Sequence, residues 1–334
     1  MPEVRHSAHR ISRAKLMVRG IVFDKRLQSG CSEQPMNQRC TVFLPDFYCR
    51  WEYRHMLKVL GFVRRNERLT HDEYRTGHVG YHGSYGRRLN NIRGYLLNIR
   101  ANRSVADCLG HSIYTAVQRN EPENFDEQWD GWGQLMFDTL DDYLAARSPA
   151  IDRAGPEGLG TDPIVAGVGG DLEDLFSGSP FQCHCDERVV VEVCRPERKL
   201  FKLVHFMQRK PQVDNDFFLN QLVGPYAQAV NECPGLRGMV VNQRTQMDVM
   251  TGFYAPESEC FTAAGAARRE RFFASWDTMI EYWFDRASDY ISLRSNPTLA
   301  ELEEALMHTS FLREVDETVA VLPNRLPSPD FYYR

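Results

Sequence analysis

The sequence predicts an α+β protein built from two copies of one strand-helix-strand-strand-helix-strand unit within a single chain. Three observations lead to this prediction. The chain matches itself at a shift of about 144 residues, the two copies show the same order of elements, and a length of 334 residues accommodates two units that each bury a core.

The internal repeat consists of two ungapped blocks. Residues 56–98 align with 200–242 with nine identities in 43 positions, and residues 129–148 align with 276–295 with eight identities in 20. The copies also differ in an informative way, because His82 and Tyr95 of the first copy align with Tyr226 and Met239 of the second. We therefore expect acid/base chemistry in the first copy only.

The elements of the first copy follow from local signals. The apolar run at 57–63 is typical of a buried strand. Thr70 followed three residues later by Glu73 has the form of a capping box, so a helix is predicted from Thr70 to about Leu89. The next predictions are a strand at 92–99, its continuation or hairpin partner at 112–118, a strand at 131–137, a helix at 139–147 and a strand at 188–193.

The second copy repeats this order. Its predicted elements are a strand at 200–208, a helix at 214–232, a strand at 238–242, a strand at 277–284, a helix at 285–293 and a strand at 318–322. This is the ferredoxin-like arrangement, in which helices cover one face of the sheet. We expect the two uncovered faces to pack together, so that both sheets close into one barrel.

Three regions follow from this alignment: an N-terminal extension at 1–54 that is partly disordered, a first repeat at 55–195 and a second repeat at 198–325. Counted to the last strand, the first repeat is longer by 18 residues, within the glycine-rich stretch 155–178. Such a loop is mobile or functional more often than it is core, and a lid over a site is one interpretation.

Composition limits the classes of function. A net charge of −5 and an isoelectric point near 6.1 disfavour nucleic acid as a partner. No apolar run reaches the roughly 18 residues of a membrane span. Nine scattered cysteines without a Cys-x-x-Cys pair indicate reduced thiols and a cytoplasmic protein. Because nucleic acid and a membrane span are disfavoured, the expected partner is a small-molecule substrate.

Several motifs occur in a fixed order. Two arginines follow the first strand, Tyr74 and His82 lie eight residues apart on the first helix, the sequence from Arg93 to Asn98 reads Arg-Gly-Tyr-x-x-Asn, and residues 129–137 read Trp-Asp-x6-Phe. This set resembles the EthD family of the dimeric α+β barrel superfamily, and the two copies cover about residues 56–193 and 200–322.

The resemblance implies an intrachain version of a dimeric α+β barrel, with a cleft between each sheet and its own helices. A homodimer of two such chains is one possible assembly. Relatives include cofactor-free lactone isomerases and pigment-pathway decarboxylases, and more distant ones include haem-degrading or cofactor-free monooxygenases. In the isomerases a helix histidine and a strand tyrosine carry the chemistry, and His82 and Tyr95 occupy the matching positions. Their strand-three cysteine is replaced by Leu135, so their particular reaction does not carry over.

Histidine is the side chain that titrates nearest cellular pH, which makes His82 the candidate general acid/base; the alternative is a histidine satisfied by a backbone carbonyl. His78 lies one helical turn earlier on the same face. Two histidines without a third ligand do not define a metal site, so neither metal nor cofactor is predicted. Aspartate and asparagine pairs that both copies retain are expected to fix turns; these are Asp130 with Asp277 and Asn98 with Asn242.

Together these observations predict a cofactor-independent lyase or isomerase for a small apolar or aromatic substrate. His82 would move the proton, and Tyr95 and His78 would bind the developing oxyanion. The expected substrate-binding residues are Tyr74, Tyr81, Phe137 and His111, the last reaching the cleft from strand two. A haem- or oxygen-using barrel and a non-catalytic binding protein remain as alternatives. The second copy's cleft should be filled by apolar side chains.

Overall fold

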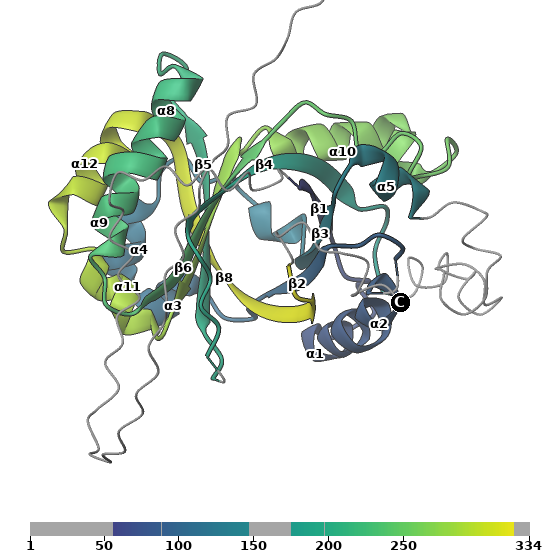
Figure 1. The fold of residues 1–334 in the computed structure, drawn as a ribbon, viewed down its shortest axis with the longest axis horizontal. Coiled ribbons are helices and arrows are strands. Elements are labelled where there is room, and N and C mark those ends of the chain that lie inside the picture. Colours follow the sequence, from purple (N-terminus) through teal and green to yellow (C-terminus); the bar gives the residue numbers. More distant parts are fainter. Residues whose placement is uncertain (1–55, 88, 147–174, 197, 324–334) are drawn as a thin grey trace, which may run out of the picture. The chain divides into compact units, whose positions relative to one another are not determined.

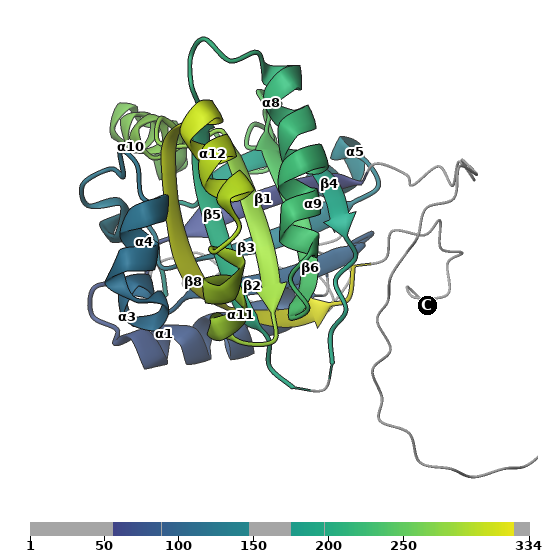
Figure 2. The same ribbon diagram turned by 90° about the vertical axis from the view of Figure 1, so that its left-hand side faces the viewer.

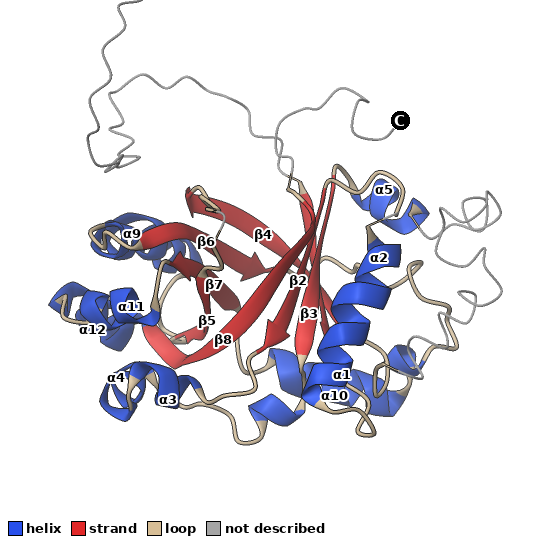
Figure 3. Cartoon of the chain, turned by 90° about the horizontal axis from the view of Figure 1, so that it is seen from below, coloured by secondary structure: helices blue, strands red, loops and turns tan. Residues whose placement is uncertain are grey.

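A computed structural model describes residues 56–87, 89–146, 175–196 and 198–323. Its strands form a closed antiparallel barrel in the order β1-β3-β2-β8-β5-β7-β6-β4, with the helices outside the barrel wall (Figures 1 and 3). The predicted closed barrel is confirmed. The strands are β1 (Leu57–Val63), β2 (Gly94–Arg100), β3 (Gly131–Phe137), β4 (Phe181–Val191), β5 (Phe201–Arg209), β6 (Leu236–Arg244), β7 (Thr278–Phe284) and β8 (Met307–Val321).

The two halves of the barrel have the same strand order. The first half runs β4-β1-β3-β2 and the second runs β8-β5-β7-β6. The register matches as well, since Leu57 pairs with Phe137 in one half and Phe201 pairs with Phe284 in the other. The halves join where β2 pairs with β8 and β4 pairs with β6. The repeat in the sequence is therefore a repeat in the structure.

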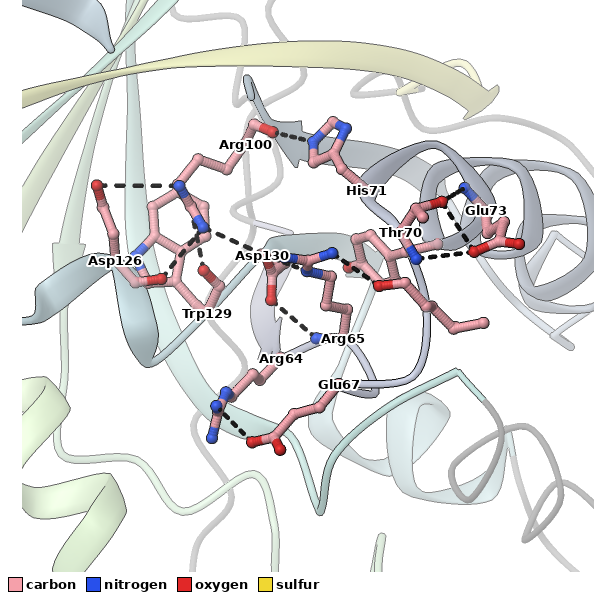
Figure 4. A network of polar contacts seen from close by, with 12 residues as sticks. Arg64, Arg65, Glu67, Thr70, His71, Glu73, Arg100, Asp126, Trp129 and Asp130 are labelled. Carbon is pink, nitrogen blue, oxygen red and sulfur yellow. Dashed lines mark hydrogen bonds and ion pairs between the residues drawn. The ribbon is translucent and has the colours of Figure 1, made fainter. Parts of the chain in front are cut away.

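The first helix starts as its capping box predicts. The Thr70 hydroxyl accepts from the Glu73 amide, and the Glu73 carboxylate accepts from the Thr70 amide at 2.8 Å (Figure 4). The helix is α1 (His71–Thr76), a π-helical turn η1 (Gly77–His82) and α2 (Gly83–Gly86). Its counterpart is α8 (Asn215–Gln221), a π-helical turn η3 (Leu222–Tyr226) and α9 (Ala227–Asn231). Both halves thus widen the helix at the same place.

Asp130 links the chain after β1 to the end of β2 rather than fixing a local turn. Its carboxylate accepts from the backbone amide of Arg65 at 2.9 Å and from the guanidinium of Arg100 at 3.2 Å (Figure 4). The prediction of a fixed turn is also wrong for Asn98 and Asn242, which lie fully buried inside the barrel. Their side chains serve the interior ion network, because both face inward from β2 and β6.

That network centres on Glu281 of β7. Its carboxylate lies 3.1 Å from the Lys58 ammonium and 2.6 Å from the Lys202 ammonium, and it accepts from Gln134 and Asn242. Burial disfavours the charged carboxylate, but the two lysines outweigh burial, so the pKa of Glu281 lies well below its ordinary value. Glu281 and Gln134 occupy equivalent positions in the two halves, so the shared carboxylate comes from the second half. Each lysine has one further carboxylate partner at 2.8 Å, Glu187 for Lys58 and Glu317 for Lys202.

The segment predicted as a strand at 112–118 is a helix. The chain between β2 and β3 forms α3 (Val105–Leu109) and α4 (His111–Val117), with Ser104 capping α3. Its apolar side chains join the core of the second half, beside α11 (Ala287–Leu293) and α12 (Pro297–Leu306) (Figures 1 and 2). Burial against the other half of the chain, which local pattern cannot reveal, accounts for the difference.

The corresponding segment of the second half packs against the first half. Between β6 and β7 lies α10 (Ala263–Phe273), and its Phe272 ring lies 4.9 Å from Phe62 and 5.1 Å from Phe181 of the first half. Each half therefore covers part of the other. The predicted second helix of the first half is present as α5 (Leu140–Ala145), capped by Thr139.

Some predictions fall outside the described residues: the extension 1–54 and the glycine-rich stretch up to residue 174. The division into repeats at 55–195 and 198–325 stays a prediction. The last strand begins at Met307, earlier than the predicted residue 318. Within the described residues, no helix is both long enough and apolar enough to span a bilayer.

Candidate functional site

A cavity of about 100 Å³ lies in the first half, between the outer face of its sheet and the helix that carries η1. Its polar lining residues are His78, His82, Tyr95, Gln182 and Tyr254. The structure therefore brings together all three residues predicted to be catalytic, from one helix and the adjacent strand β2.

The cavity exists because small residues line it. At four positions of β1 and β3 the first half carries a smaller side chain than the second half carries at the equivalent register. The four pairs are Gly61 and His205, Val63 and Met207, Gly133 and Ile280, and Leu135 and Tyr282. The repeat comparison thus explains which half retains an open cleft.

Two glycines leave the space that the Tyr95 ring occupies. A Cβ atom at Gly86 would lie 2.4 Å from the ring, and one at Gly133 would lie 3.2 Å from it. In the second half Met239 replaces the tyrosine, and Val230 and Ile280 replace the two glycines. Glycine at these positions allows an aromatic side chain to lie flat between the helix and the neighbouring strand.

His78 lines the cavity as a buried, neutral imidazole. Its Nδ1 lies 2.7 Å from the Tyr74 hydroxyl, and both side chains are buried. Burial raises the pKa of Tyr74 and, together with the charge of His82, lowers the pKa of His78, so both groups stay neutral. With Tyr74 as the donor in this hydrogen bond, the proton of the neutral imidazole lies on Nε2.

His82 is half-buried and lies edge-on to His78, with 5.1 Å between ring centroids. The ring of Phe176 covers both imidazoles, at 5.2 Å from His78 and 5.3 Å from His82. Phe176 belongs to the last part of the glycine-rich stretch that the sequence predicts as a lid. Only this end of the stretch is described, so the lid stays a prediction.

The predicted substrate-binding residues do not line this cavity. Tyr74 lies behind His78 as its hydrogen-bond partner, and Phe137 is buried against Tyr143. Tyr81 is 43% exposed on the helix surface. His111 lies on α4 rather than on strand two, with 85% of its side chain exposed beside Asp107. The prediction that His111 reaches the cleft from strand two is wrong, because the segment after β2 turns toward the other half.

Sequence reasoning missed Gln182 and the second-half residues Phe253 and Tyr254, which also line the cavity. Gln182 pairs with Gly61, and its counterpart by register is Leu312. Gln182 lies outside the two blocks that align in the sequence, so comparison of those blocks does not reveal this pair. Phe253 gives no signal in sequence, because it comes from the other half.

The cleft of the second half is filled. Tyr226, in the place of His82, donates to Glu303 at 3.0 Å and accepts from Tyr282 at 3.1 Å. Arg294 forms a buried ion pair with Glu303 at 2.6 Å. The expectation of a purely apolar filling is therefore wrong in detail, since tyrosines and an ion pair take up the space.

A larger hollow of about 650 Å³ lies along the outer face of β4 and includes His184. The His184 Nδ1 lies 2.7 Å from the Thr245 hydroxyl. Its neighbours Cys183 and Cys185 face the barrel interior, because successive side chains of a strand point to opposite faces. The hollow begins at Met56, directly after undescribed residues, and it contains none of the predicted catalytic residues, so the smaller cavity is the candidate site.

No family model matches the sequence, and no curated protein matches it either. Membership of the EthD family is thus not shown. Among solved structures, the chain is similar to a candidate monooxygenase from Fusobacterium nucleatum (7% identity, 79% of this chain, 93% of that chain, TM-score 0.42). It is also similar to an anthrone oxidase-like protein (12%, 82%, 97%, 0.41) and to a mutant chlorite dismutase from Candidatus Nitrospira defluvii (10%, 79%, 92%, 0.40).

Proposed function

We propose that this chain is a cofactor-independent lyase or isomerase whose active site is the cavity of the first half. The substrate is a small apolar or aromatic molecule with an acidic C–H bond, a carboxylate or a lactone. The observation that carries the proposal is that His78, His82 and Tyr95 line one cavity, while the equivalent cleft of the second half is filled. The fold then corresponds to an EthD-like dimeric α+β barrel made of two fused ferredoxin-like repeats.

Each residue has a distinct role in this proposal. His82 takes the proton from the acidic carbon and returns it to the product or leaving group. The Nε2–H of neutral His78 and the Tyr95 hydroxyl donate to the oxygen on which negative charge develops. Phe176 and the apolar lining exclude water, which strengthens these hydrogen bonds.

A haem-using barrel fits this cavity less well. The space of about 100 Å³ lies below the roughly 300 to 1,000 Å³ of pockets for drug-sized ligands, and a porphyrin requires more. The Nδ1 of His78 is also engaged by Tyr74. An absorbance spectrum of the purified protein tests this alternative, because bound haem gives a Soret band.

The test is proton exchange in D₂O, followed by ¹H NMR on a panel of small lactones, β-keto acids and aryl ketones without added cofactor. The wild-type chain should accelerate deuterium incorporation at the acidic carbon of at least one class. His82→Gln should reduce that rate by about 10²- to 10⁴-fold with little change in melting temperature. Tyr226→Phe, at the equivalent position of the second half, is the matched control and should retain the rate.

Full exchange activity in His82→Gln would contradict the proposal, as would binding of the compounds without any exchange or conversion. The latter result would favour the non-catalytic binding function. A homodimer of fused pairs and a cytoplasmic location stay predictions. Sedimentation velocity measures the first of these directly.

A further inference from the structure

Gln182 presents its amide nitrogen to the cavity. The side chain is buried, and its Oε1 accepts a hydrogen bond of 2.7 Å from the hydroxyl of Tyr143. That bond fills one of the two lone pairs of the oxygen and fixes the orientation of the amide, whose two N–H groups are its donors to other partners. A Cβ atom at Gly61 would lie 3.6 Å from Nε2, so the amide lies against the part of the wall that glycine leaves open.

Tyr143, which orients this amide, is itself held by two neighbouring aromatic rings. Tyr143 is fully buried, and its ring is stacked on Phe253 with 4.3 Å between centroids and 3° between planes. The Phe137 ring packs edge-on against the Tyr143 ring, with 5.4 Å between ring centroids. Phe253 belongs to the connection between β6 and β7, so the second half helps to orient a polar group in the cavity of the first.

The second half keeps the tyrosine but not the glutamine. Tyr290 is equivalent to Tyr143 and is also buried, whereas Leu312 stands where the first half has Gln182. His205 fills the place of Gly61. The core therefore does not require an amide at this position, and the amide occurs in the half that has an open cavity.

We propose that Gln182 is the specificity-determining residue of the cavity and that it donates, together with His78, to an oxygen of the substrate. Two N–H donors beside the Tyr95 hydroxyl select small molecules that carry a carbonyl or carboxylate oxygen. Tyr143 is the positioning residue that fixes the amide. This inference rests on the proposed function in placing the substrate in the same cavity.

The test compares ligands of similar size that differ in whether they carry an oxygen atom. Binding to the full chain is measured by NMR titration with γ-butyrolactone, cyclopentane, isobutyrate and isobutylamine. The wild type should bind the lactone more tightly than cyclopentane, and isobutyrate more tightly than isobutylamine. Gln182→Met keeps the length of the side chain without its hydrogen bonds. It should weaken isobutyrate binding by about 10- to 100-fold and change cyclopentane binding by less than about twofold.

Two further variants keep the test informative if Gln182→Met is poorly folded. Gln182→Glu preserves size and the hydrogen bond from Tyr143, and it should reverse the preference toward isobutylamine. Tyr143→Phe should weaken isobutyrate and lactone binding but leave cyclopentane binding unchanged, which a purely structural role would not produce. Tyr290→Phe is the matched control and should change none of these affinities.

Equal wild-type affinity for the lactone and cyclopentane would overturn the inference, as would undiminished isobutyrate binding in Gln182→Met. Its failure is distinguishable from failure of the proposed function. Ligand selection and proton exchange are measured separately on the wild type and Gln182→Met, so a protein that selects oxygen through Gln182 but exchanges no proton refutes only the enzymatic proposal. Exchange that depends on His82 but is indifferent to Gln182 refutes only this one.

Discussion

Replacing Glu281 by glutamine should destabilise the barrel more than any surface substitution. The Glu281 carboxylate is fully buried and shared by the ammonium groups of Lys58 and Lys202. Removing its charge leaves each ammonium with one carboxylate partner, Glu187 for Lys58 and Glu317 for Lys202, both at 2.8 Å. The loss of a buried, charged hydrogen-bond partner costs about 1.5 to 3 kcal/mol. For a domain of this size that corresponds to a fall in melting temperature of about 3 to 12 °C.

Urea denaturation followed by circular dichroism measures this change in the free energy of unfolding. The matched variant is the exchange Gln134→Glu with Glu281→Gln, which moves the carboxylate to the equivalent position of the other half. Since Gln134 already contacts Glu281 at 2.5 Å, the moved carboxylate stays within the same network. The double variant should regain at least half of the lost stability.

The dependence on pH has a definite sign. Because the folded pKa of Glu281 is depressed, its contribution is fully present above the unfolded value of about 4.3 and is lost as pH falls toward the folded value. The wild type and Glu281→Gln should therefore converge in stability in acid. A loss below about 1 kcal/mol in Glu281→Gln at neutral pH would refute the reasoning, and so would a double variant less stable than either single one.

Three further outcomes follow from the same structure. Gly86→Ala should abolish most proton exchange because its Cβ would meet the Tyr95 ring, whereas Gly80→Ala, with open space around it, should raise the melting temperature slightly; both are measured on the same preparations. Burial lowers the pKa of His205 to about 3, so its contribution to stability is present above about pH 6.5 and is lost toward pH 3; His205→Asn should flatten a thermal-melt profile over that interval. Tyr226→Phe should lower the free energy of unfolding by about 1 to 2 kcal/mol in urea, because the Glu303 carboxylate loses a buried donor.

The sequence predicted correctly those helices and strands that have local signals, such as a capping box or an apolar run. The capping box of Thr70 and Glu73 and the apolar run of β1 are such cases, and both are confirmed. Helix α4 was misread because its stability comes from burial against the second half, and helices this short are marginal by themselves. The start of β8 was missed because Arg313 and Glu314 interrupt its apolar pattern. Their charges are paired with Glu121 and Arg103 across the fold.

The site was predictable to the extent that the repeat reveals it. Comparing the copies identified His82 and Tyr95, and the structure places both on one cavity. Gln182 required the register of the last strands, and Phe253 required knowledge of which half covers which. Neither follows from one sequence, because strand register and contacts between halves are properties of the closed barrel.

Closure of the barrel has a consequence during protein synthesis. The strands β2 and β4 find their outer partners only in β8 and β6, which the ribosome makes later. At about 5 to 20 residues per second, the 121 residues from Phe201 to Val321 take roughly 6 to 24 s to translate. During that time the edge at β4 lacks its partner until β6 is made, and the edge at β2 lacks its partner until β8 is made; unpaired sheet edges are templates for aggregation. A chain truncated between the repeats would keep both edges unpaired, so we expect it to aggregate.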